Sequence, residues 1–120
     1  MNAEPAKRED PLFVEIGCND GILIKRIDDR FRKVGVDPSD IAAKGHDGTY
    51  KLINEFFSDD MTDSFSEESV DIVSTSNSFA HFSDISGAIS EISRILKVNG
   101  IVVVEVHDGD LLLGDNHWDT

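Results

Sequence analysis

Short apolar runs alternate along this chain with segments of helical spacing, and this alternation limits the possible folds more than any other feature of the sequence. Five segments have the composition of buried strands: 12–16, 33–37, 50–54, 70–74 and 101–106. A crossover through a helix leaves the two strands that it joins parallel. The alternation therefore predicts an α/β fold with a parallel sheet of about five strands flanked by helices.

Three helices are expected between these strands. The first follows Gly21, where apolar residues recur at spacings of three and four: Leu23, Ile24, Ile27 and Phe31. Ser39 can cap a second helix that runs to about Lys44, and the third runs from Ile85 until Asn99 and Gly100 end its apolar repeat. Residues 58–69 are rich in Ser, Asp and Glu, so this stretch is expected to be the least ordered, with one helical turn.

Length, charge and cysteine content narrow the class of protein. The 120 residues suffice for one domain, and a formal net charge of −13 opposes binding to the phosphates of nucleic acids. No apolar run approaches the ~20 residues that a membrane span needs. Because Cys18 is the single cysteine and residues 1–10 lack an apolar signal segment, a cytoplasmic protein is expected. We expect residues 1–11 to be a flexible segment and 12–120 to be the domain.

The loop after the first predicted strand, Gly17 to Gly21, has the residue types of a ligand-binding loop. Glycines at both ends let the backbone turn sharply and let a ligand approach, and Asn19 tolerates a left-handed backbone better than most residues do. The dinucleotide fingerprint G-x-G-x-x-G is absent, because its second and third glycine positions hold Asn19 and Ile22. An ordinary turn between a strand and a helix is the alternative.

Asp37 is the second candidate, at the end of the second predicted strand and twenty residues after Gly17. A carboxylate at this point can accept hydrogen bonds from both hydroxyls of a ribose, as in dinucleotide-binding folds. The alternative is an Asp that forms a turn before Pro38. The loop and the carboxylate together favour a nucleotide-like ligand at the carboxyl ends of the strands.

A resemblance to a known family rests on five runs of sequence: FVEIGCNDG, VGVDPS, NEFF, VDIVSTSNSFAHF and RILKVNGIVVVE. Together they resemble a class I S-adenosylmethionine-dependent methyltransferase, whose core is a Rossmann-like sheet. The E-I-G-x-N-D-G and N-x-F-x-H elements are most similar to C-methyltransferases that act on deoxysugar nucleotides. The resemblance covers about residues 11–120.

The resemblance implies cofactor-binding roles for these residues: Glu15, Gly17, Cys18, Asn19, Asp20, Gly21, Asp37, Glu55, Phe56, Phe57 and Asn77. Glu15 would support the cofactor loop, residues 17–21 would cradle the methionine moiety, and Asp37 would hold the ribose. Residues 55–57 would border the adenine, although the two aromatic rings could equally belong to the core. Asn77 would lie near the methionine end, with a turn-forming Asn as the alternative.

A catalytic residue is harder to identify. His81 is the candidate, because its loop follows the fourth strand on the cofactor side, and a purely structural His is the alternative. In the sugar C-methyltransferases that this chain resembles, a catalytic Tyr, Glu and His cluster lies beyond the segment that corresponds to residues 117–120. We expect no metal site, because no pair of these residues has the i, i+4 spacing of helical ligands: His107, Asp108, Asp110, His117 and Asp119.

The resemblance also implies that the cofactor-binding core is incomplete. Class I methyltransferases complete the sheet with two further strands, and we expect this chain to lack both. The fifth strand would then have an unpaired edge, which another strand, a second copy or a partner chain would cover.

Three functions remain open at this point. The first is transfer of a methyl group from S-adenosylmethionine to a small molecule such as a nucleotide-linked sugar. The second is a non-catalytic module that binds the cofactor and works with a partner. The third is an NAD-dependent oxidoreductase, which the missing glycine fingerprint disfavours.

Overall fold

The computed structural model describes residues 10–58, 61, 63–76, 85–106 and 109–113 of the chain. The elements follow one another as β1 (Leu12–Ile16), the 3-10 helix η1 (Ile24–Arg26), β2 (Arg32–Val36), α1 (Asp40–Gly45), β3 (Lys51–Ile53), β4 (Val70–Ser76), α2 (Ile85–Ile95), β5 (Leu96–Val106) and β6 (Gly109–Leu113). None of the helices in this described part is long and apolar enough to cross a membrane.

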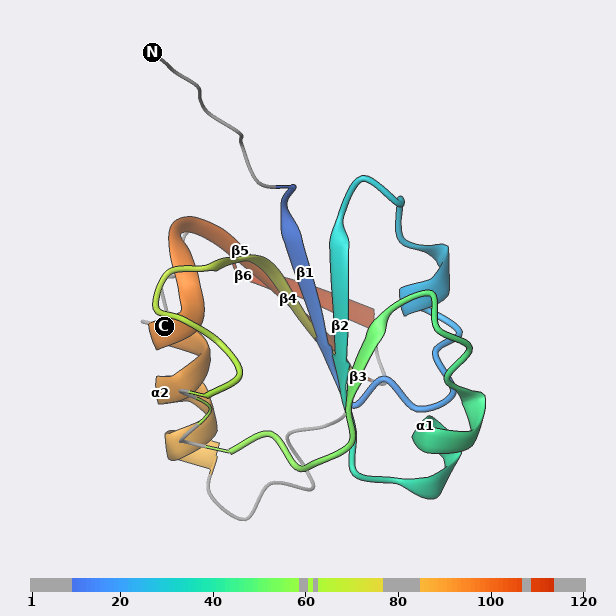
Figure 1. Cartoon of the computed structure of the whole chain (residues 1–120). Coiled ribbons are helices and arrows are strands. Elements are labelled where there is room, and N and C mark those ends of the chain that lie inside the picture. Colours follow the sequence, from blue (N-terminus) through green and yellow to red (C-terminus); the bar gives the residue numbers. More distant parts are fainter. Residues whose placement is uncertain (1–9, 59–60, 62, 77–84, 107–108, 114–120) are drawn as a thin grey trace.

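All strands of the described residues belong to one sheet with the order β3-β2-β1-β4-β5-β6 (Figure 1). β1 to β5 pair in parallel, and β6 pairs with β5 in the antiparallel direction. The predicted α/β fold with five parallel strands is confirmed. Because β1 lies between β2 and β4, the ends of these three strands meet at one edge of the sheet, where open α/β sheets bind their ligands.

The two faces of the sheet bury separate apolar clusters. α2 covers one face, and α1 with η1 covers the other (Figure 1). The larger cluster lies under α2 and includes Val14, Val73 and Ile92. The smaller cluster lies under α1 and η1 and consists of Phe13, Cys18, Ile24, Ala42 and Tyr50. Alternate residues of β1 serve the two clusters, as the period of a strand requires.

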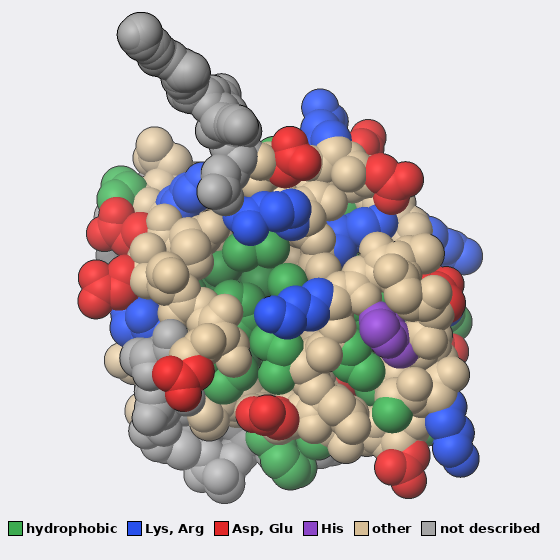
Figure 2. Space-filling view, in the orientation of Figure 1, with side chains coloured by type: hydrophobic (Ala, Val, Ile, Leu, Met, Phe, Trp, Pro, Cys, Tyr) green, Lys and Arg blue, Asp and Glu red, His purple; other side chains and the backbone are tan. Residues whose placement is uncertain are grey.

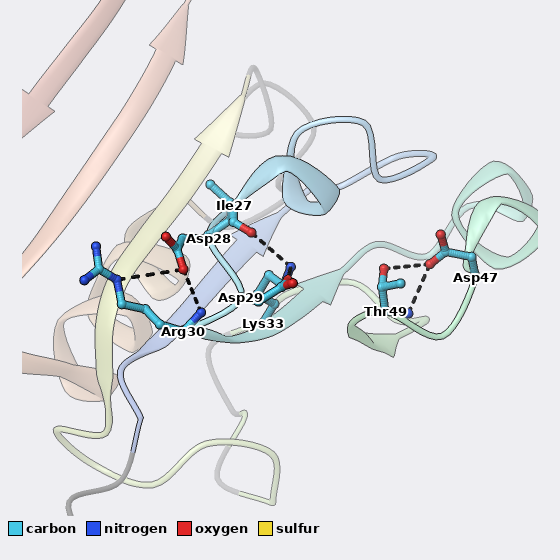
Figure 3. A network of polar contacts seen from close by, with 7 residues as sticks. All are labelled: Ile27, Asp28, Asp29, Arg30, Lys33, Asp47 and Thr49. Atoms are coloured by element: carbon cyan, nitrogen blue, oxygen red, sulfur yellow. Dashed lines mark hydrogen bonds and ion pairs between the residues drawn. The ribbon is translucent and has the colours of Figure 1, made fainter.

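The prediction of a helix after Gly21 is wrong in length, because only the single 3-10 turn η1 forms there. Ile27 already has an extended backbone, and the following acidic residues bond locally instead of continuing a helix. The carboxylate of Asp28 accepts from the backbone N–H of Arg30 at 2.8 Å. The Lys33 ammonium contacts the Ile27 carbonyl and the Asp29 carboxylate (Figure 3). Such side-chain bonds compete with helical hydrogen bonds.

The end of the last helix also differs from the prediction. α2 ends at Ile95 and β5 begins at Leu96, whereas the sequence pattern placed this boundary at Asn99. Leu96 pairs with Val70 and Ile101 pairs with Ile72, so residues 97–100 form an irregularity opposite a single residue of β4. Periodicity alone did not reveal this bulge, because the buried Leu96 continues the apolar repeat of the helix.

The expectation of an unpaired edge on the fifth strand is wrong. β6 covers that edge, with Val102 opposite Leu113 and Val106 opposite Gly109. The sheet therefore contains one strand more than the sequence analysis expected. A signal for it was present, because a D-G dipeptide followed by the apolar run 111–113 is typical of a β-hairpin.

The segment between β3 and β4 is packed more firmly than expected, and it contains one turn of helical spacing, in which the Phe65 N–H donates to the Met61 carbonyl at 2.8 Å. Met61 and Phe65 are buried in the larger cluster. The Met61 backbone N–H donates to Glu91 Oε2 at 3.0 Å, and Arg94 Nη2 donates to the Phe65 carbonyl at 2.8 Å. Arg94 also binds Glu91 through two nitrogens. This ion pair on α2 therefore fixes the segment to the helix.

Candidate functional site

The loop from Gly17 to Gly21 leaves β1 in an unusual backbone conformation. The φ angles are +81° at Gly17, +53° at Asn19 and +86° at Gly21, all in the left-handed region. The prediction that Asn19 adopts this conformation is confirmed. The Gly17 N–H donates to the Val36 carbonyl at 2.7 Å, which ties the start of the loop to the end of β2.

Two close contacts explain why glycine is needed around this loop. A Cβ atom on Gly21 would lie 2.6 Å from the hydroxyl oxygen of Tyr50. A Cβ atom on Gly35 of β2 would lie 2.6 Å from the sulfur of Cys18. Real Cβ atoms do not approach other atoms this closely, so both glycines let neighbouring segments pack directly against the loop.

Asp37 connects the loop to the segment that follows β2. Its Oδ2 accepts from the Asn19 backbone N–H at 2.9 Å, and its Oδ1 accepts from the Ser39 backbone N–H at 2.8 Å. The two candidates from the sequence, the loop and this carboxylate, are thus in direct contact. The same segment continues into α1, where the Ser39 side chain accepts from the Ala42 N–H as the predicted cap.

The Asp37 carboxylate is charged at neutral pH although only 6% of the residue is exposed. Burial raises its pKa, but hydrogen bonds from Ser39 and Asn19 stabilise the charged form and outweigh burial. The net effect holds the pKa below the ordinary value of 3.8. The site therefore contains a fixed negative charge.

Asn54, directly after β3, is a site residue that the sequence analysis did not single out. Its side-chain amide donates to the Asp37 carbonyl at 2.7 Å and to the Ser39 carbonyl at 3.1 Å. The Asp37 N–H in turn donates to the Ile53 carbonyl at 3.0 Å. Asn54 thus fixes the end of β2 against the end of β3. The sequence signal that could have identified Asn54 was its position at the start of the NEFF run, which carries part of the family resemblance.

Glu15 and Cys18 are both buried beside the loop, on the face that α1 and η1 cover. Burial, and then the negative charges of Asp37 and Glu15, raise the pKa of the Cys18 thiol to about 12. The thiol is therefore neutral and packs in the smaller cluster. Only the Cys18 backbone is left to contact a ligand.

The residues after β3 divide into a core residue and exposed ones. Phe57 is buried in the larger cluster, so the core alternative holds for this ring. Phe56 is 67% exposed and Glu55 is also exposed, and both follow the carboxyl end of β3. Asp20 lies in the loop, where its carboxylate accepts from the Ile22 N–H at 3.3 Å.

Some candidates lie outside the described residues: Asn77, His81, His107, Asp108, His117 and Asp119. Within the described part of the chain, no group of His, Cys, Asp and Glu side chains is arranged to hold a metal ion.

A family model for a methyltransferase domain matches residues 14–104. The chain belongs to this methyltransferase family. The match includes the loop, Asp37 and the residues after β3, and it agrees with the enzyme class and the cofactor that the sequence predicted. It does not favour the oxidoreductase alternative. A search of curated proteins found no match.

Solved structures show the same fold. A Haloferax volcanii protein described as a methyltransferase, solved with the Trm112 methyltransferase activator, is 27% identical with a TM-score of 0.68, covering 80% of this chain and 45% of that one. Geranyl diphosphate C-methyltransferase from Streptomyces coelicolor A3(2), solved with S-adenosyl-L-homocysteine, is 24% identical with a TM-score of 0.70, and the match covers 82% of this chain and 39% of that one. The Bacillus subtilis YcgJ protein is 22% identical with a TM-score of 0.66, and the match covers 81% of this chain and 44% of that one. This methyltransferase chain spans less than half the length of these proteins.

Proposed function

We propose that this methyltransferase chain binds S-adenosylmethionine at the carboxyl ends of β1, β2 and β3 and supports methyl transfer to a small molecule. The observation that carries the proposal is the contact of the Asp37 carboxylate with the Asn19 and Ser39 backbone N–H groups. It places a charged acceptor next to a glycine-containing loop at the ligand-binding edge of a parallel sheet. Family membership supports the same cofactor.

The described residues fit the separate parts of this cofactor. The Asp37 carboxylate accepts from the Asn19 and Ser39 backbone N–H groups and is also stabilised by the Ser39 side chain. A carboxylate offers about four acceptor positions, so it can still accept from a ribose hydroxyl. The exposed Phe56 ring, with Glu55 beside it, would contact the adenine. Residues 17–21 would hold the methionine moiety with Glu15 supporting their loop, and the sequence resemblance assigns Asn77 to the same end of the cofactor. The sulfonium group of the bound cofactor supplies an electrophilic methyl group, so the protein's main task is orientation.

The proposed acceptor is a small molecule, with a nucleotide-linked sugar as the candidate that the sequence resemblance suggests. A net charge of −13 opposes nucleic acid as the acceptor. On the face drawn in Figure 2, acidic and basic side chains are interspersed, which does not resemble the basic surface of a nucleic-acid-binding protein. His81 remains the proposed catalytic base, and the single Cys18 supports a cytoplasmic location.

A second candidate function is a cofactor-binding chain that acts only with a partner. The Haloferax volcanii neighbour, which was solved with an activator protein, favours this candidate. A partner chain or a second copy would then contribute the residues that act on the acceptor.

Calorimetric titration with S-adenosylmethionine, S-adenosylhomocysteine and NAD tests the proposal. We expect both sulfur compounds to bind and NAD not to bind. Asp37→Ala should weaken binding of S-adenosylhomocysteine by about 1.5 to 3 kcal/mol, because hydrogen bonds to a charged group are lost. A preference for NAD, or no binding of either sulfur compound, would contradict the proposed function.

Asp28→Ala is the matched control. Asp28 also accepts from the backbone N–H two residues later, at Arg30, so it forms the same local turn as Asp37 (Figure 3). Its exposed side chain contacts Arg30 and, among the described contacts, none of residues 17–21. Its replacement should leave the affinity unchanged, whereas an equal loss in both variants would remove Asp37 from the ribose role.

A further inference from the structure

Tyr50 lies under the Gly17 to Gly21 loop and has no role in the function proposed so far. Only 5% of the residue is exposed, and its ring packs in the smaller cluster with Cys18 and Ile24. A Cβ atom on Gly21 would meet the Tyr50 hydroxyl oxygen at 2.6 Å. The hydroxyl therefore lies directly against the backbone of the candidate cofactor loop.

This hydroxyl has no hydrogen-bond partner among the described residues. A buried polar group without a partner destabilises a fold by about 1–3 kcal/mol. Phenylalanine would fill the same space without this penalty. The hydroxyl is thus a destabilising feature of the ligand-free chain, placed at its candidate binding loop.

The hydroxyl can act only as a neutral donor or acceptor. Burial, followed by the charge of neighbouring acidic groups, raises the pKa of Tyr50. The phenol therefore keeps its proton in the physiological pH range. A backbone carbonyl of the loop would be a suitable acceptor for that proton.

The segment that carries Tyr50 is tied to the loop side of the molecule. Lys25 Nζ, one turn after Gly21, donates to the Gly45 carbonyl at 3.1 Å and lies 3.6 Å from the Asp47 carboxylate. His46 contacts the Tyr50 carbonyl through Nε2, and the centroids of the His46 and Tyr50 rings lie 4.9 Å apart. These contacts hold the Tyr50 ring in place beneath the loop.

We propose that Tyr50 is a positioning residue whose hydroxyl donates a hydrogen bond to the Gly17–Gly21 loop when the cofactor is bound. The inference rests on the proposed function, because it needs a ligand in the loop. Binding would then satisfy a group that is unpartnered in the free chain. Part of the binding free energy would come from this bond and not from a contact with the ligand.

The test uses Tyr50→Phe and a spectroscopic probe of the wild-type chain. Tyr50 is the only tyrosine, so labelling with [13Cζ]tyrosine gives a single NMR signal. We expect this signal to shift when S-adenosylhomocysteine saturates the chain. Tyr50→Phe should bind S-adenosylhomocysteine about five- to tenfold more weakly, because one hydrogen bond is lost. Its melting temperature without ligand should equal or exceed that of the wild type.

Thr75→Val is the control for removal of a buried hydroxyl. The Thr75 hydroxyl also has no partner among the described residues, but it lies on the α2 face, in register with Ile16 and Val104. Thr75→Val should leave the affinity unchanged.

Three results would overturn the role of Tyr50: an unshifted signal, equal affinity of Tyr50→Phe and wild type, or a lower melting temperature of ligand-free Tyr50→Phe. Equal losses of affinity in Tyr50→Phe and Thr75→Val would overturn it too. If the wild type binds normally in these cases, the proposed function stands and only the role of Tyr50 falls. No binding by the wild type would overturn both.

Discussion

The face of the sheet under α2 and the face under α1 and η1 differ in how fully their buried groups are satisfied. Under α2, Val14, Val73 and Ile92 are completely buried, and the buried Glu91 carboxylate binds Arg94 and the Met61 backbone. Thr75, the exception with an unpartnered hydroxyl, lies near the carboxyl end of β4. The α2 face has the properties of an ordinary stable core.

The other face has a smaller cluster and more local strain. Gly17, Asn19 and Gly21 have positive φ angles, Asp37 is a buried charge, and the Tyr50 hydroxyl has no described partner. Strain and unsatisfied polar groups gather where a ligand can compensate for them. We therefore propose that the face under α2 stabilises the fold and that the face under α1 and η1 supports binding. The following variants test this division.

Ile92→Ala should have the largest effect, on stability alone. Ile92 is fully buried, and its truncation leaves a cavity in the larger cluster. We expect the free energy of unfolding to fall by about 3–4 kcal/mol in a urea titration. Affinity for S-adenosylhomocysteine, measured where the variant is still folded, should not change. The exposed Val98→Ala should change stability by less than about 0.5 kcal/mol. A large loss of affinity in Ile92→Ala would contradict this division between a stabilising face and a binding face.

Glu91→Ala should have the next largest effect and should lower the free energy of unfolding by about 2–3 kcal/mol. It leaves the partly buried Arg94 without its carboxylate and the Met61 N–H without an acceptor. Glu67→Ala, in an exposed position, is the control and should be nearly neutral. Urea titration measures both. Equal effects of the two variants would show that the ion pair does not hold the segment between β3 and β4.

Gly21→Ala should affect both properties, with a loss of about 1–2 kcal/mol in stability and a clear loss of affinity. The added methyl group would collide with the Tyr50 hydroxyl at a φ of +86°. Gly48→Ala is a matched control, since Gly48 has a φ of +90° and open space around its Cβ position. It should lose stability through backbone strain alone and keep its affinity. Indistinguishable binding by the two variants would argue against the loop as the binding site.

The pH dependence of Asp37 should give the smallest effect. Its pKa in the folded chain is below the ordinary 3.8, so the carboxylate stabilises the fold fully above that pH. This contribution is lost as the pH falls through the folded pKa. The difference in unfolding free energy between wild type and Asp37→Asn should therefore shrink below pH 3.8. A difference that stays constant down to pH 2 would contradict the depressed pKa.

The sequence predicted the elements whose signals are local. Apolar runs located the parallel strands, and Ser39 capped α1 as expected. The left-handed Asn19 was predicted as well, because it depends on the local turn between Gly17 and Gly21.

Features that depend on distant contacts were not predicted. The bond from Asn19 to Asp37, the contact of Tyr50 with Gly21 and the burial of Met61 exist only once the sheet has formed. The local sequence also misled where side chains compete with the backbone, as at Asp28, where a helix was expected and a turn formed. The pairing of β5 with β6 was missed because the sequence analysis took the fifth strand as the last.

The central claim is that the cofactor binds at the carboxyl ends of β1, β2 and β3. A 15N-labelled sample titrated with S-adenosylhomocysteine tests it most directly, through the backbone amide signals of each residue. The account predicts the largest shifts at residues 17–21, at Ser39 and at residues 55–57, with little change along the outer face of α2 at Ser86, Ser90 and Ser93. Shifts concentrated on α2, or no shifts at saturating ligand, would contradict it.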